Sequence, residues 1–312
     1  MSEPIVPPKV PKTYSELPVR HIRIKNHPEN APGVTPIQIV ELFRPGKHNA
    51  FTYEMAADIV RTWDTFAVDD RVKVIVLAGE GKIFCAGADL SGAFQRSDDD
   101  INGHRDTGGQ VALAIYRCPK PTIAAMQGAA VGVGVTMTLP ATIRVAWKDA
   151  KVGFVFSRRG LVMEAASSYF LPRLIGMSRA LHLVTTGAVY PASSKLFDGL
   201  FSELLDTPDQ VLPRALEIAE EVAANCSSVS IALMKEMMYR GTDSPEAQHL
   251  LDSKLIFDLY GTPDIKEGVA SFLEKRPVKF TGTLAADAPV HYPWWNTVDV
   301  RTRKQDKRAA KL

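Results

Sequence analysis

The sequence predicts an α/β core followed by a helical region, and three observations support this fold class. Strand patterns alternate with helical patterns from residue 20 to about residue 146. After Gly160 nearly every pattern has helical spacing. Two glycine-rich turns, at residues 84–90 and 128–134, each follow a short apolar run. The alternation predicts helices packed on a sheet, and the later run predicts a helical extension.

The individual elements follow from spacing and from proline positions. Apolar runs predict strands at residues 20–24, 37–43, 72–77, 122–126 and 143–146. Between them, helical spacing predicts helices at 50–66, 111–116 and 130–139, and the polar stretch 91–107 predicts a loop. In the second half, helices are predicted at 164–174, 178–186, 208–224, 230–239, 244–260 and 265–275.

Composition excludes several classes of protein. The chain of 312 residues is 46% hydrophobic and 23% charged, as is usual for soluble globular proteins. A net charge of +2 gives no reason to expect a nucleic-acid partner. No apolar run approaches the ~20 residues that a membrane span needs. The cysteines Cys85, Cys118 and Cys226 show neither a disulfide framework nor metal-ligand spacing, so we expect no metal site.

The two ends of the chain have their own signals. Residues 1–18 are rich in proline, which predicts an extended arm. The last three residues, Ala-Lys-Leu, resemble the Ser-Lys-Leu address that the peroxisomal import receptor reads. We therefore expect a peroxisomal location, with the cytoplasm as the alternative.

The two glycine-rich turns are the strongest indication of chemistry. Their small side chains let a ligand approach the backbone, so that chain N–H groups point at it. Two such turns facing each other would hold one oxygen atom between two N–H donors. That geometry is an oxyanion hole, which stabilises negative charge developing on a carbonyl oxygen.

These turns and the segments around them resemble the enoyl-CoA hydratase/isomerase (crotonase) family. The segments that carry the resemblance are residues 44–51, 74–90, 119–143, 171–176, 186–187, 198–200 and 271–276. The resemblance implies a ClpP/crotonase-like spiral of ββα units over residues 19–205. It also implies a helical trimerisation region over 206–280, a tail over 281–312, and a homotrimer or a dimer of trimers.

The resemblance also implies the substrate and its binding residues. The substrate is an acyl-CoA thioester, so coenzyme A arrives as part of the substrate and no cofactor is expected to stay bound. The two oxyanion donors fall on the amides of Ala88 and Val133. Further substrate contacts are expected in the two turns and near the end of the chain, at Ala86, Gly87, Asp89, Leu90, Gly132 and Lys275.

The general base is where the sequence departs from the family's hydratases. Thr136 and Phe156 stand where those hydratases carry two glutamates, and neither side chain is a base at neutral pH. Glu164 lies eight residues after Phe156. Its surroundings resemble the Pro-Glu-Gly-x-Ser-Ser segment of peroxisomal-type Δ3,Δ2-enoyl-CoA isomerases, in which that glutamate shuttles the proton. Burial in an apolar pocket would raise its pKa to suit that role.

Three functions remain open at this point. The first is an isomerase that shifts a double bond through an enolate, with Glu164 as proton shuttle. The second is an enoyl-CoA hydratase that uses Glu164 with a second group such as His104, which sits beside Arg105 and Asp106 in the polar loop. The third is a noncatalytic protein that binds CoA thioesters, in which Glu164 only favours the start of a helix. The acyl chain and the pathway are not specified.

Overall fold

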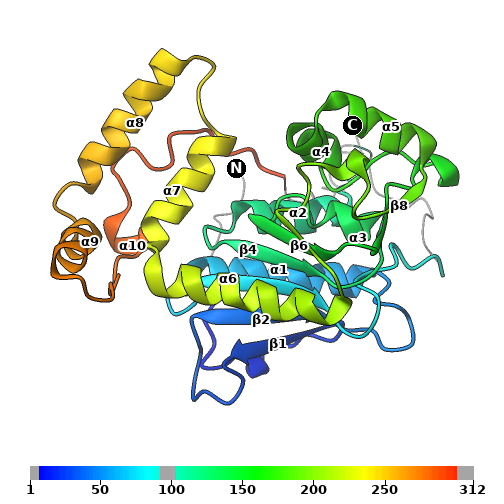
Figure 1. Ribbon diagram of the computed structural model, residues 1–312, viewed down its shortest axis with the longest axis horizontal. Coiled ribbons are helices and arrows are strands. Elements are labelled where there is room, and N and C mark those ends of the chain that lie inside the picture. Colours follow the sequence, from blue (N-terminus) through cyan, green and yellow to red (C-terminus); the bar gives the residue numbers. More distant parts are fainter. Residues whose placement is uncertain (1–6, 92–100, 102, 301–312) are drawn as a thin grey trace, which may run out of the picture.

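The computed structural model describes residues 7–91, 101 and 103–300. Its centre is a six-stranded sheet in the order β1-β2-β3-β4-β6-β9 (Figure 1). The strands are β1 (Ile22–His27), β2 (Ile37–Leu42), β3 (Val74–Gly79), β4 (Thr122–Met126), β6 (Ile143–Trp147) and β9 (Glu203–Leu205). β1 runs antiparallel to β2, and all other neighbours in this sheet are parallel.

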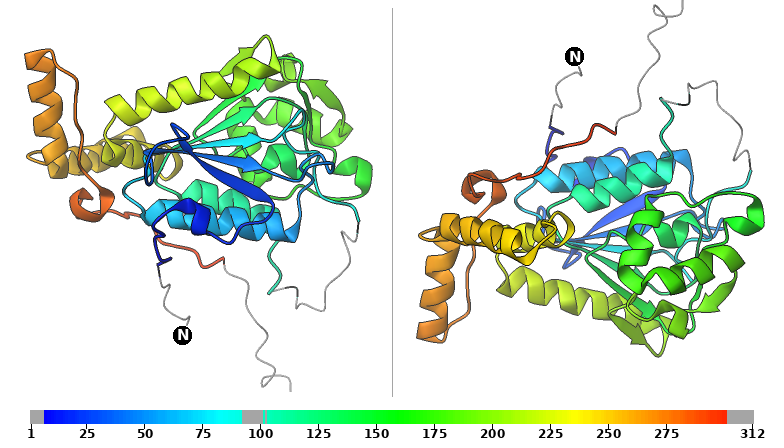
Figure 2. Two further views of the ribbon diagram at one scale, coloured as in Figure 1. Left: turned by 90° about the horizontal axis from the view of Figure 1, so that it is seen from below. Right: turned by 90° about the horizontal axis from the view of Figure 1, so that it is seen from above.

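Helices cover both faces of this sheet. Helices α1 (Tyr53–Val68) and α2 (Thr107–Arg117) lie on one face, and α6 (Val211–Asn225) lies on the other (Figure 2). Burial on both faces explains why β3 is apolar throughout. Helix α6 lies within residues 206–280, the expected trimerisation region, and its buried side chains pack on the sheet as part of the core.

A second, three-stranded sheet adjoins the first one. It contains β5 (Ala130–Val131), β7 (Lys151–Gly153) and β8 (Val189–Pro191), in that order. The helices α3 (Val133–Thr136), α4 (Ser167–Ile175) and α5 (Met177–Thr186) lie at the same end of the molecule (Figure 1). The described parts of the chain also contain four short 3₁₀ helices: η1 (Tyr14–Glu16), η2 (Ser157–Arg159), η3 (Lys195–Phe197) and η4 (Pro208–Gln210).

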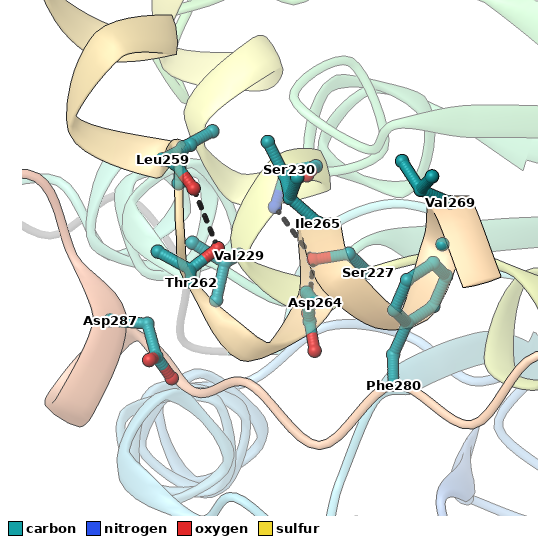
Figure 3. A pocket seen from close by; sticks show the side chains of 11 residues that line it. Ser227, Val229, Ser230, Leu259, Thr262, Asp264, Ile265, Val269, Phe280 and Asp287 are labelled. Carbon is teal, nitrogen blue, oxygen red and sulfur yellow. Dashed lines mark hydrogen bonds between the residues drawn. The ribbon is translucent and has the colours of Figure 1, made fainter.

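A helical arm extends from the opposite end. It consists of α7 (Ser228–Tyr239), α8 (Pro245–Leu259), α9 (Pro263–Glu274) and α10 (Leu284–Asp287) (Figure 1). A cavity of about 300 Å³ lies between these helices, and in it Ser227 Oγ donates a hydrogen bond of 2.6 Å to Asp264 Oδ2 (Figure 3). Large apolar side chains on α8 and α9 are exposed, including Phe257, Phe272 and Leu273.

The described part of the N-terminus packs on the core, and the described part of the tail contacts the end of α7. Tyr14 is buried, and its hydroxyl donates to Asp69 Oδ2 at 2.7 Å beside the end of α1. In the tail, Trp294 Nε1 donates to the carbonyl of Arg240 at 2.9 Å. The final Ala-Lys-Leu and residues 92–100 and 102 of the polar loop lie outside the described residues.

Three expectations from spacing need correction. The helix expected at 130–139 is shorter, because Ala130 and Val131 pair with β7 and the helix begins only at Val133. The helix expected to begin at Glu164 begins at Ser167. The short strands β8 and β9 lie in a region expected to be nearly all helical, because three-residue strands leave little periodic signal.

Among the described residues, no helix has the length and apolar character that crossing a membrane requires.

Candidate active site

The first glycine-rich turn is held by a neighbouring segment. The Phe51 amide donates to the carbonyl of Gly87, and the Asp89 amide donates to the carbonyl of Phe51, both at 2.8 Å. This bridge ties the residues on either side of Ala88, so the Ala88 N–H points away from Phe51. Among the bonds formed by described residues, the Ala88 amide has no acceptor.

The second turn is joined directly to the first. The Cys85 amide donates to the Ala129 carbonyl at 3.0 Å, and the Val131 amide donates to the Cys85 carbonyl at 3.1 Å. A Cβ at Gly134 would lie 2.4 Å from the Cys85 carbonyl oxygen, so only glycine permits this approach. The two turns therefore lie side by side.

Val133, whose amide is the expected second oxyanion donor, is the first residue of helix α3. Gly132 has a φ of +56°, a conformation that favours glycine, and Val133 follows as the first helical residue. First-turn amides have no acceptor within their own helix. None of the bonds within the described parts of the chain uses the Val133 N–H. Ala88 and Val133 thus present unpaired donors on two adjacent turns.

Other turn residues are engaged in holding the turns. The Ala86 amide donates to the His48 carbonyl at 3.1 Å. Asp89 accepts from the Ser91 amide and hydroxyl and pairs with Arg44 at 2.9 Å. These bonds, those from Ser91 first, lower the pKa of Asp89 to about 2. The Asp89 carboxylate therefore stabilises the turn, and its contact with substrate stays a prediction, as does that of the exposed Leu90.

Glu164 lies in the turn before α4, not within a helix. The Ser167 amide and hydroxyl donate to the Glu164 carbonyl at 3.0 and 2.5 Å. Ala165 and Ala166 both have positive φ, at 58° and 50°. Alanine rarely adopts this left-handed conformation, so the surrounding contacts must hold the turn in place.

The carboxyl group of Glu164 contacts two helices. Thr136 Oγ1, on α3, donates to Glu164 Oε1 at 2.5 Å. Glu164 Oε2 lies against Gly108 in the first turn of α2, 1.7 Å from where a Cβ of residue 108 would sit. Thr136 is three residues after Val133, so the carboxyl group contacts the helix that begins with the expected second oxyanion donor.

The environment of Glu164 suits proton transfer. Burial raises the pKa of this carboxyl group, the hydrogen bond from Thr136 lowers it, and the nearby charge of Asp106 raises it; together they bring the pKa to about 7. A carboxyl group with this pKa both accepts and returns a proton near neutral pH.

The structure brings some predicted residues to this site and not others. Asp106 is close, because its Oδ1 accepts from the Ala165 amide at 3.3 Å. His104, in contrast, has an exposed side chain. Lys275 ends helix α9 in the arm, at the opposite end of the molecule from α3 and α4 (Figures 1 and 2). Its expected contact with coenzyme A stays a prediction.

Sequence reasoning did not anticipate that Thr136 bonds Glu164 or that Gly108 adjoins it. One available signal was the stretch Asp106-Thr107-Gly108-Gly109, since aspartate is a preferred helix N-cap and the glycines leave space. No signal in the spacing linked Thr136 to Glu164.

Comparisons with known proteins agree with this geometry. A family model described as Enoyl-CoA hydratase/isomerase matches residues 33–283. "Enoyl-CoA hydratase AFT3-1" of Alternaria alternata is 50% identical over 272 residues, which are 87% of this chain and 90% of that protein. "1,2-epoxyphenylacetyl-CoA isomerase" of Escherichia coli (strain K12) is 30% identical, over 79% of this chain and 95% of that one.

A solved structure supports the same assignment. The crystal structure of a putative enoyl-CoA hydratase from Streptomyces coelicolor A3(2) superposes with a TM-score of 0.72 at 32% identity. The match covers 88% of this chain and 100% of that chain. The crotonase fold expected from the sequence is therefore confirmed. The chain is an acyl-CoA enzyme and belongs to the enoyl-CoA hydratase/isomerase (crotonase) family.

Proposed function

We propose that this enzyme moves the double bond of a 3-enoyl-CoA to the 2-position, with Glu164 as its only proton shuttle. The observation that carries the proposal is one partly buried carboxyl group, with a pKa of about 7, that is hydrogen-bonded to the helix beginning with Val133. Thr136 and Phe156 occupy the positions of the two glutamates expected in a hydratase.

The reaction needs one base and one place for negative charge. Ionised Glu164 takes a proton from C2 of the thioester, and the electron pair moves onto the carbonyl oxygen. The amides of Ala88 and Val133 donate hydrogen bonds to that oxygen while it carries the charge. Protonated Glu164 then returns the proton at C4, and the electrons move back to form the C2–C3 double bond.

Hydration of a 2-enoyl-CoA is the second candidate. Two observations favour it: the Alternaria alternata relative is described as a hydratase, and Asp106 lies next to Glu164. However, Asp106 Oδ1 already accepts from the amides of Gly109 and Ala165. Asp106 thus joins two segments through one of its oxygens, and Thr136 and Phe156 stand in place of both hydratase glutamates, so we favour the isomerase.

Replacing the shuttle group should abolish turnover. In Glu164→Gln the amide oxygen still accepts the bond from Thr136, so we expect thioester binding to persist while kcat falls at least a hundredfold, about the contribution of a general base. The measurement is steady-state turnover of 3-enoyl-CoA. Glu221→Gln, an exposed change on α6, is the matched control and should turn over normally. Wild-type kcat in Glu164→Gln would contradict the proposal.

The product separates the two candidates. We expect a 3-enoyl-CoA to give a product of unchanged mass, and a substrate deuterated at C2 to carry deuterium to C4, because Glu164 returns the proton that it removed. A hydratase would instead add the mass of one water to a 2-enoyl-CoA and would take its oxygen from ¹⁸O-labelled solvent. Mass spectrometry and NMR of the products distinguish these results, and hydration without isomerisation would favour the second candidate.

The pH profile should report the pKa of Glu164. The shuttle must be ionised to accept the first proton, so kcat/KM should be low in acid and rise with a midpoint near pH 7. The measurement is kcat/KM for 3-enoyl-CoA between pH 5 and pH 9. A midpoint near 4.5, the ordinary value for glutamate, would show that burial does not control the base.

Glu164 should also lower stability at high pH. Its pKa is about 7 when folded and near 4.5 when unfolded, so the unfolded state loses its proton first and stability falls as pH rises between these values. Glu164→Gln should then be more stable than wild type above pH 7, by about 3 kcal/mol at most, and equal near pH 4. Chemical denaturation at both pH values tests this; a difference independent of pH would contradict it.

We also propose that the arm packs on other copies of the chain, in a homotrimer or a dimer of trimers. Phe272 and Leu273 on α9 are 83% and 72% exposed in the single chain, which supports a contact there. The double variant Phe272→Asp/Leu273→Asp should reduce the molecular mass measured by light scattering to that of smaller species. Val68→Asp, at the exposed end of α1, should not. Equal masses for both variants would contradict the proposal.

A further inference from the structure

One carboxylate oxygen connects the start of α2 to the turn that carries Glu164. Asp106 is the N-cap of α2, and its Oδ1 accepts from the Gly109 amide at 2.5 Å. The same oxygen accepts from the Ala165 amide at 3.3 Å. Ala165 directly follows Glu164, so this atom fixes the distance between the helix and the base.

The first turn of α2 leaves a space that the Glu164 side chain fills. A Cβ at Gly108 would lie 1.7 Å from Glu164 Oε2 and 2.9 Å from its Cδ. Real Cβ contacts are never this short, so no other residue fits at position 108 unless the carboxyl group moves. Glycine weakens a helix and is unfavourable here on propensity alone.

The Glu164 turn depends on such support. Ala165 and Ala166 both hold positive φ, which alanine does not adopt without constraint. Thr136 fixes only one carboxyl oxygen, Oε1. The other oxygen lies against Gly108, and the Ala165 amide that follows Glu164 donates to Asp106, the N-cap of α2.

We propose that Asp106 and Gly108 are positioning residues for Glu164, Asp106 by fixing its turn and Gly108 by leaving room for its carboxyl group. This inference rests on the proposed role of Glu164 as the base. A proton that leaves C2 and returns at C4 must be carried by a group in one fixed place, so a small displacement lowers kcat. Neither residue contacts the thioester in this scheme, so KM changes little.

Two variants at Asp106 test its part. Asp106→Ala removes the shared acceptor, and we expect kcat to fall between about ten- and a hundredfold with KM within about threefold of wild type. Asp106→Asn keeps an acceptor oxygen and should retain most of kcat. It also removes a like charge beside Glu164, so the midpoint of kcat/KM should move to lower pH. Cys85 also lies near Glu164, but burial raises the pKa of its thiol to about 12, so it stays neutral and does not shift this midpoint.

A matched N-cap variant separates positioning from stability. Ser244→Ala removes the bond that Ser244 Oγ accepts from the Ala247 amide at the start of α8, far from Glu164. It should lower the melting temperature as Asp106→Ala does, but leave kcat and the pH profile unchanged. A purely structural role for Asp106 would make the two variants behave alike.

A double-mutant cycle tests Gly108 without relying on activity. Gly108→Ala should lower the melting temperature in wild type, because the methyl group displaces Glu164. In Glu164→Ala the space is empty, so the same change should be neutral or stabilising. Gly268→Ala on α9, where the nearest atom to a new Cβ would be 3.5 Å away, is the control and should not depend on residue 164.

The outcomes separate this inference from the proposed function. Wild-type kcat in Asp106→Ala, or an equal effect of Gly108→Ala in both backgrounds, overturns the positioning roles. If Glu164→Gln keeps full activity, the proposed base itself fails. If Asp106→Ala does not fold, the Gly108 cycle still decides between support and rejection.

Discussion

The site depends on the close backbone approach of two turns that are about forty residues apart in the chain. The Cys85 amide donates to the Ala129 carbonyl, and the Cys85 carbonyl accepts from the Val131 amide. These two bonds fix the position of one turn relative to the other. The approach is possible because Gly134 has no side chain to meet the Cys85 carbonyl. Neither the Ala88 N–H nor the Val133 N–H has an acceptor among the described residues, because Phe51 bonds on either side of Ala88 and Val133 begins α3. Buried strands on either side fix the turns, so the donors are in place before a ligand binds.

The acid is added to this framework from a third segment. Glu164 belongs to neither turn, yet Thr136 attaches it to α3 and Gly108 admits it beside α2. Burial favours the neutral form of Glu164, whereas the proposed reaction needs the ionised form for its first step. A pKa of about 7 makes both forms available near neutral pH. The same shift in pKa lowers the stability of the folded state at neutral pH.

Much of this arrangement could be predicted from the sequence, for identifiable reasons. The apolar runs carry local signals, so the core strands were expected. The turn glycines suggested an oxyanion hole, and the resemblance to the family assigned its donors to Ala88 and Val133, which stays a prediction. Glu164 was identified from its flanking residues, but its turn was not, because two alanines with positive φ contradict local propensity. The contact between Thr136 and Glu164 joins residues 28 apart, and the bond from Ala165 to Asp106 joins residues 59 apart. Such contacts exist only in the folded chain.

The attachment of Glu164 through a threonine has a consequence for divergence within the fold. In the proposed mechanism the two turns supply the donors to the thioester oxygen, and the acid comes from another segment. A residue on α3 can therefore exchange a carboxylate for a hydroxyl while the main-chain donors stay unchanged. In this scaffold, losing a carboxylate at one position and gaining one at another can change the reaction. The main-chain donors proposed to stabilise an enolate are not altered by such substitutions.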